Sequence, residues 1–139
     1  MGDKVNEAVL YSRVRKRAAE QGWFFMQVEN ARDRGTPDLY VASWNALGLG
    51  FAIWVECKTA NTPKSDDHAL NGFEIRKGQK KWHREFTDKS GHPSYFLFQV
   101  GGGIKARRYL VPGYRILRPS KITERLLKDA DVLEKYPVC

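Results

Sequence analysis

One short stretch of the chain carries residue types that could do chemistry together. Pro37-Asp38 is followed by Glu56-Cys57-Lys58, with seventeen residues between Asp38 and Glu56. Because side chains alternate between the two faces of a strand, Glu56 and Lys58 are expected to share one face. Charged groups on an otherwise apolar strand need partners, since burying an unpaired charge is costly. Asp38 begins the neighbouring predicted strand, so two carboxylates and one lysine are expected to lie close together.

Such a group of side chains suits a hard divalent cation. Mg²⁺ prefers oxygen ligands and often uses one or two carboxylates together with a substrate phosphate. Asp38, Glu56 and the carbonyl oxygen of Cys57 are the expected ligands of Mg²⁺ or Mn²⁺. The metal would lower the pKa of a bound water, and Lys58 would orient that water, stabilise hydroxide or offset transition-state charge. The alternative is an ordinary ion pair between Glu56 and Lys58 at a strand end.

Two further polar residues fall on apolar helix stripes. Glu7 continues the stripe of Leu10, Val14 and Ala18 in the first predicted helix, and Gln79 begins the inward-facing stripe of the second. Glu7 could instead be a helix-end carboxylate favoured by the helix dipole. Gln79 could be a satisfied amide at the edge of the core. In the functional interpretation, both residues join the same candidate site.

The hydrophobic pattern predicts the elements that must position these residues. The expected helices are 4–21, 74–90 and 120–134, and the expected strands are 23–28, 38–43, 51–58, 94–100 and 107–111, with a hairpin at 45–50 and a long loop at 59–72. The first three strands form a meander, and a crossover helix leads to the fourth. This order predicts an α/β fold with a mixed β-sheet flanked by helices, on an α-β-β-β-α-β core.

The candidate residues and their elements resemble a known superfamily. The order of Glu7, Pro37-Asp38, Glu56-X-Lys58 and Gln79 is similar to that of the PD-(D/E)XK nucleases. Within the superfamily, this set looks most like the stand-alone VRR-NUC proteins and archaeal-type Holliday junction resolvases. Two segments look particularly like VRR-NUC members, namely Gly35-Thr36-Pro37-Asp38-Leu39 and Gly78-Gln79-Lys80-Lys81-Trp82. The similarity spans about residues 5–111.

The resemblance implies a restriction-endonuclease-like fold and metal-dependent hydrolysis of DNA phosphodiesters. It makes Glu7, Asp38 and Glu56 acidic residues of the metal site, Lys58 catalytic and Gln79 a supporting residue. Residues 1–111 would form the nuclease domain. For residues 112–139 the resemblance provides no counterpart that we can name. They are expected to form a C-terminal extension of the same compact unit, as a dimerisation or DNA-contacting addition.

The charge balance agrees with a nucleic-acid partner. The 139 residues hold 24 Lys and Arg against 16 Asp and Glu, which gives a net charge of +8. Basic side chains of the second helix and of the Pro-Asp turn would contact phosphates, although a solvated helix face is the alternative. We expect His83 of that helix to lie at the surface. The candidate DNA-binding residues are Arg32, Arg34, Arg76, Lys77, Lys80, Lys81 and Arg84.

Several classes of protein are excluded by the same sequence. No apolar run is long enough to span a membrane, and the N-terminus lacks the apolar core of a secretory signal. Gly101-Gly102-Gly103 is not followed by Gly-Lys-Ser/Thr, so no nucleotide cofactor is expected. Two cysteines cannot form a disulfide framework, which favours the cytoplasm. A small nuclease of this kind would suit a bacteriophage acting in its host's cytoplasm.

The function expected from these observations is a structure-specific DNA endonuclease similar to a Holliday junction resolvase. Two symmetric cuts in a four-way junction require two sites, so a two-fold homodimer is expected. A nicking or replication-repair nuclease acting on branched or nonspecific DNA is the alternative within the same class. The alternative of another class is a non-catalytic DNA-binding module whose carboxylates are structural.

Overall fold

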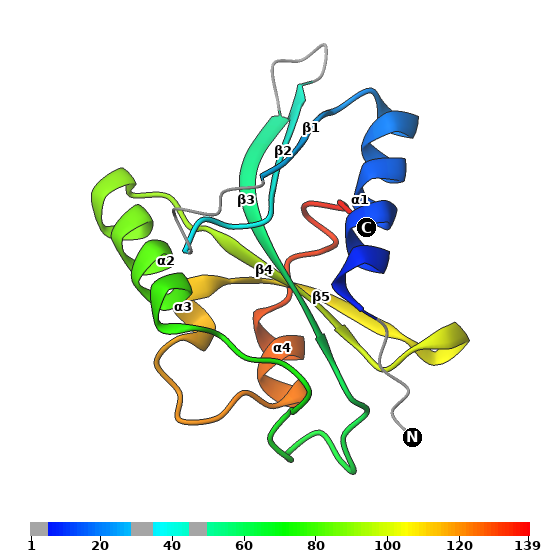
Figure 1. Ribbon diagram of the computed structural model, residues 1–139, viewed down its shortest axis with the longest axis vertical. Helices are drawn as coiled ribbons and strands as arrows, with labels where there is room; N and C mark the ends of the chain where they lie inside the picture. Colours follow the sequence, from blue (N-terminus) through cyan, green and yellow to red (C-terminus); the bar gives the residue numbers. More distant parts are fainter. Residues whose placement is uncertain (1–5, 29–34, 45–49) are drawn as a thin grey trace.

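A five-stranded sheet organises the computed structural model, which describes residues 6–28, 35–44 and 50–139 (Figure 1). The strand order is β1-β2-β3-β4-β5, and every pair of neighbours is antiparallel except the parallel pair β3 and β4. The predicted meander and crossover helix are therefore confirmed. In chain order the elements are α1 (Glu7–Gln21), β1 (Phe24–Gln27), β2 (Leu39–Trp44), β3 (Gly50–Ala60), α2 (Lys77–Ser90), β4 (Tyr95–Val100), the 3-10 turn η1 (Gly103–Lys105), β5 (Arg107–Pro112), α3 (Gly113–Ile116) and α4 (Glu124–Ala130).

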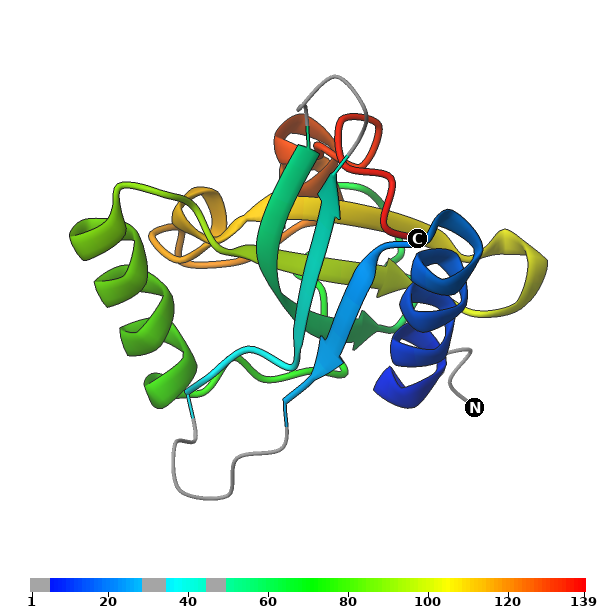
Figure 2. The same ribbon diagram turned by 90° about the horizontal axis from the view of Figure 1, so that it is seen from above.

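The sheet separates two hydrophobic cores, and helices flank both of its faces (Figure 2). Val55 and Cys57 of β3 point into the core that α1 covers. The other core is built around Phe96 and Phe98 of β4 and is covered by α3 and α4. Strand alternation therefore sends Glu56 and Lys58 away from α1, toward the side on which α2 lies. The predicted α/β class, a mixed sheet with flanking helices, is confirmed.

None of the helices in the described ranges is long and apolar enough to cross a membrane.

The predicted hairpin at 45–50 lies outside the described residues except for Gly50. The loop that follows β3 covers residues 61–76, four residues longer at its C-terminal end than predicted. We call this segment the 61–76 loop.

The predicted C-terminal helix over 120–134 is wrong in its length, since α4 covers only half of that range. The Thr123 side chain caps the start of α4 by accepting a hydrogen bond from Leu126 N at 3.1 Å. At the other end, Asp131 adopts an extended conformation, and its Oδ1 accepts hydrogen bonds from Leu110 N at 2.8 Å and Leu133 N at 3.0 Å. These side-chain contacts compete with further helix, so the apolar stripe overestimates the helix length.

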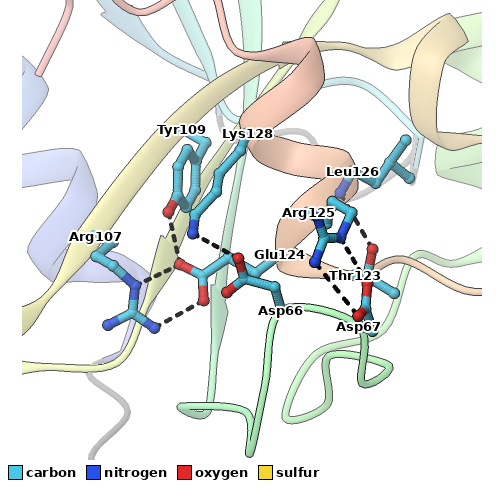
Figure 3. Close-up of polar contacts among 9 residues, drawn as sticks. All are labelled: Asp66, Asp67, Arg107, Tyr109, Thr123, Glu124, Arg125, Leu126 and Lys128. Atoms are coloured by element: carbon cyan, nitrogen blue, oxygen red, sulfur yellow. Dashed lines mark hydrogen bonds and ion pairs between the residues drawn. The ribbon is translucent and has the colours of Figure 1, made fainter.

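A polar network joins α4 to β5 (Figure 3). The carboxylate of Glu124, 1% exposed, accepts hydrogen bonds from Tyr109 Oη at 2.6 Å and Arg107 Nη2 at 2.8 Å, and Arg107 Nε also donates to it. The Arg107 guanidinium lowers the pKa of Glu124, although burial opposes this shift. The buried carboxylate is thus held ionised by its partners, which fixes α4 against the sheet.

The 61–76 loop is fastened to the same helix. Figure 3 shows Asp67 beside Arg125 and Asp66 beside Lys128, with oxygen–nitrogen distances of 2.6 and 2.8 Å. The backbone of Leu70 also donates a hydrogen bond to Ile122 O at 2.8 Å. Exposed ion pairs contribute little each, but together with the backbone bond they tie the loop to the C-terminal segment.

Replacing Glu124 by Gln is expected to reduce the free energy of unfolding by about 2 kcal/mol, because hydrogen bonds to a buried charged group are lost or weakened. Urea unfolding of Glu124→Gln measures this effect. The exposed Glu134 offers the matched control, and Glu134→Gln should unfold like the unaltered chain. Equal stability of the two variants would contradict a stabilising role for the network.

Candidate active site

Two carboxyl groups meet where β2 begins beside β3. Leu39 of β2 pairs with Val55 of β3, so Asp38, one residue earlier, lies opposite Glu56. Beyond this point β2 no longer supplies backbone partners to β3. The Asp38 side chain replaces a backbone acceptor here, because its Oδ2 accepts a hydrogen bond from Cys57 N at 3.1 Å. The Pro-Asp turn therefore places one carboxylate against the strand that carries the other.

Glu56 is buried next to that carboxylate, and one of its two carboxyl oxygens lacks a hydrogen-bond partner among the described residues. Its side chain is 2% exposed, and its Oε1 has no hydrogen-bond partner among the residues that the structure describes. Burial, followed by the neighbouring Asp38 carboxyl, raises the pKa of Glu56 far above its ordinary value. An unpartnered buried carboxylate oxygen beside a second carboxyl group fits a divalent cation, which prefers such oxygen ligands.

Lys58 is held beside this pair by α2 and the loop before it. Its Nζ donates hydrogen bonds to Glu74 O at 2.7 Å and Gln79 Oε1 at 3.1 Å, and it lies 3.9 Å from Glu56 Oε2. The ion pair with Glu56 is thus the longest of its three contacts. Gln79 Oε1 also accepts a hydrogen bond from Arg76 N at 2.9 Å, which fixes the amide at the start of α2. The ammonium group is oriented by neutral acceptors rather than by a simple ion pair.

The first helix brings Glu7 and Tyr11 toward the same place. Tyr11 Oη donates a hydrogen bond to Glu7 Oε2 at 3.3 Å. Burial and then the carboxylates of Asp38 and Glu7 raise the pKa of Tyr11. Tyr11 was not among the candidate residues, yet it lies one helical turn after Glu7, so the helical period could have indicated it.

The metal-ligand set expected from the sequence is only partly assembled. Within residues 6–28, 35–44 and 50–139, no group of three His, Cys, Asp or Glu side chains lies close enough to hold a metal ion. Asp38 and Glu56 form a pair, and Glu7 approaches it on the side of Tyr11. The Cys57 side chain is fully buried in the core beneath α1, so only its backbone is available to the site.

The expectation that His83 lies at the surface is wrong. His83 is 1% exposed, its ring stacks on Phe96 with centroids 4.4 Å apart, and its Nδ1 is hydrogen-bonded to Ser94 Oγ. Burial, with a smaller effect of Lys58, lowers the pKa of His83 to about 3, so the imidazole is neutral. The signal was present, because His83 follows Gln79 by four residues and shares its inward face.

The basic residues of α2 lie on its solvent-facing side. Arg76 directly precedes α2, and its backbone N–H donates a hydrogen bond to Gln79, which in turn holds Lys58. The basic side chains of α2 follow from this point along the helix. Arg32 and Arg34 lie outside the described residues. The exposed basic side chains of the helix itself are Lys77, Lys80, Lys81 and Arg84.

Comparison with solved structures supports the fold. No family model matches the sequence, and no curated protein matches it. Among solved structures, Hjc from Archaeoglobus fulgidus, a Holliday junction resolvase from an archaeal hyperthermophile, superposes with a TM-score of 0.56 at 13% identity. The match covers 94% of this chain and 99% of Hjc. The chain therefore shares its α/β fold, a mixed five-stranded sheet with flanking helices, with an archaeal Holliday junction resolvase.

Proposed function

We propose that this chain is a metal-dependent DNA endonuclease of the PD-(D/E)XK type. The observation that carries the proposal is the buried Glu56 Oε1, which has no hydrogen-bond partner among the described residues and lies beside Asp38, with the Lys58 ammonium group held 3.9 Å from Glu56 Oε2. A fold kept only for stability would gain from an apolar group at such a position, since a buried carboxyl group whose hydrogen bonds are incomplete is destabilising. Retaining two carboxyl groups and a lysine there suits a reaction at phosphorus.

In this proposal Asp38, Glu56 and the carbonyl oxygen of Cys57 hold Mg²⁺ or Mn²⁺, and Glu7 adds negative charge to the site. The metal supplies activation of a water molecule and neutralises charge on the phosphate. Lys58 donates a hydrogen bond to the attacking water or to a phosphate oxygen. Gln79 and the Glu74 carbonyl restrict the position of its ammonium group, so that it is oriented before substrate binds.

The proposed substrate is branched DNA, cut by a homodimer in the manner of a resolvase. The exposed lysines and arginine of α2, together with Arg76, supply positive charge that begins next to Lys58. Contacts of this kind position the phosphate backbone without reading the sequence. Arg32 and Arg34, which flank the Pro-Asp turn, are proposed to contribute to the same surface. The relation to VRR-NUC proteins rests on the two motif segments.

A substrate panel tests the proposal. Purified protein is mixed with a four-way junction, a flap and a linear duplex of matched length, each with Mg²⁺ and with EDTA. We expect cleavage only with the metal, and faster cleavage of the branched substrates. Absence of metal-dependent cleavage on every substrate would rule out the nuclease. Equal cleavage of all three would rule out the preference for branched DNA.

A non-catalytic DNA-binding module is the second candidate. It is favoured by the structural role of Asp38, whose Oδ2 accepts a hydrogen bond from Cys57 N at 3.1 Å. Binding of the same panel, measured by fluorescence anisotropy in EDTA, distinguishes the two functions. Tight binding together with no cleavage in Mg²⁺ or Mn²⁺ would favour the binding module.

A further inference from the structure

A cleft of about 310 Å³ lies between the 61–76 loop and the segment that joins α3 to α4. The two walls belong to distant parts of the chain but run side by side (Figure 1), because the Leu70 amide donates a hydrogen bond to Ile122 O. The ion pairs of Asp66 and Asp67 with α4 fasten the loop at the same end (Figure 3). The cleft is therefore formed before any ligand arrives.

This cleft adjoins the candidate active site. Ile75 in its wall follows Glu74, whose carbonyl oxygen accepts a hydrogen bond from Lys58. Lys80 at its rim follows Gln79, the other partner of Lys58. A ligand in the cleft would thus contact the sequence neighbours of Glu74 and Gln79, the two residues that orient Lys58.

The lining combines an apolar floor with positive charge. Leu70, Phe73 and Ile122 contribute apolar surface, and the half-buried Phe73 ring packs edge-on against Phe98 at 5.2 Å. The exposed side chains of Lys80 and Lys121 supply two ammonium groups, of which that of Lys121 also donates a hydrogen bond to Asp67 O at 3.3 Å. None of the described residues that line the cleft is acidic. An apolar floor beneath cations is complementary to a nucleobase attached to its phosphate.

We propose that the cleft takes a single unpaired nucleotide of branched DNA. This inference rests on the proposed nuclease function and deepens it, because it names a feature by which a flap or bulge, which carries unpaired nucleotides, is distinguished from a fully paired duplex. The base packs on Leu70, Phe73 and Ile122, and its phosphate meets Lys80 and Lys121. The volume lies at the low end of ligand pockets, which run ~300–1,000 Å³, so it suits one nucleotide rather than a stacked helix end. Stacking on a ring tolerates every base, so no sequence preference is expected.

The test compares a duplex carrying one extrahelical nucleotide with the fully paired duplex. Full-length protein is titrated into each fluorescein-labelled DNA, and anisotropy is followed in EDTA so that no strand is cut. We expect about tenfold tighter binding of the bulged duplex, the effect of one stacked base. Lys121→Ala and the rim variant Ser120→Trp should each reduce this preference. Lys105→Ala, which removes an exposed lysine from η1 outside the cleft, should retain it.

Two results would overturn the inference. One is equal affinity of the unaltered chain for bulged and paired duplexes. The other is an unchanged preference in Lys121→Ala and Ser120→Trp alike, which would place the bulge elsewhere or assign the cleft to another occupant. The binding titration contains EDTA and therefore tests the cleft alone, whereas the cleavage panel with Mg²⁺ tests the nuclease proposal. A chain that prefers the bulge but cuts nothing contradicts catalysis alone, and one that cuts without this preference contradicts the cleft alone.

Discussion

Lys58→Ala is expected to lower the rate of metal-dependent cleavage by roughly 10²- to 10⁴-fold, while DNA affinity in EDTA stays close to that of the unaltered chain. Lys58 is 5% exposed, and its ammonium group donates hydrogen bonds to Glu74 O and Gln79 Oε1, so it lies at the site and not on the outer basic surface. In the proposed reaction, a group positioned in this way would act on the reacting phosphate or its water. Single-turnover cleavage of the best substrate in the panel measures its contribution.

The matched control is Lys128→Ala, which also removes one lysine but takes it from an exposed ion pair with Asp66. It should cut at the normal rate. Lys58→Met retains most of the aliphatic stem and shows whether a loss in Lys58→Ala reflects packing. Cleavage by both Lys58 variants at more than a tenth of the normal rate would refute the catalytic role. Loss of DNA binding in both would indicate instead that Lys58 contributes to the binding surface.

The part of this site that was predictable follows from strand and helix periods. The period of two places Glu56 and Lys58 on one face of β3, and the structure confirms that Val55 and Cys57 occupy the other. The helical period places Gln79 on the inward face of α2, where it is buried. Local alternation is enough for such inferences because each residue's direction depends only on its own element.

The rest depends on contacts between distant segments, which local patterns do not encode. The Glu74 carbonyl that orients Lys58 is a backbone atom of the 61–76 loop, so its residue type carries no signal. The end of α4 is determined by Asp131, which is bonded to Leu110 of a neighbouring strand. The likeness to Hjc extends to the fold at 13% identity, a level at which the arrangement of elements persists although most side chains differ.

Glu56→Gln is expected to act on activity and stability in opposite directions. It should abolish metal-dependent cleavage, because a neutral amide replaces a carboxylate ligand. It should also stabilise the metal-free protein at pH 8 by a few kcal/mol, since each unit of pKa shift corresponds to about 1.4 kcal/mol. Urea unfolding in EDTA measures the gain, and Glu85→Gln, at an exposed position on α2, is the matched control.

The dependence on pH follows from the direction of the shift. In the unfolded chain Glu56 loses its proton near its ordinary pKa of 4.5, whereas in the metal-free fold burial and then Asp38 raise the pKa to about 10. The unfolded state therefore binds fewer protons between these values, and the stability contributed by the protonated carboxyl falls as pH rises from about 4.5 to 10. Glu56→Gln should make this slope shallower.

Mg²⁺ should reverse the order of stability of the unaltered chain and Glu56→Gln. A cation that binds only the folded state stabilises it in proportion to the logarithm of its concentration, so Mg²⁺ should raise the unfolding midpoint of the unaltered chain. Glu56→Gln, which lacks one ligand, should show a smaller response. If Glu56→Gln is less stable than the unaltered chain in EDTA at pH 8, then the Glu56 carboxylate is stabilised within the fold itself. The unpartnered oxygen would in that case provide no argument for a metal at this position.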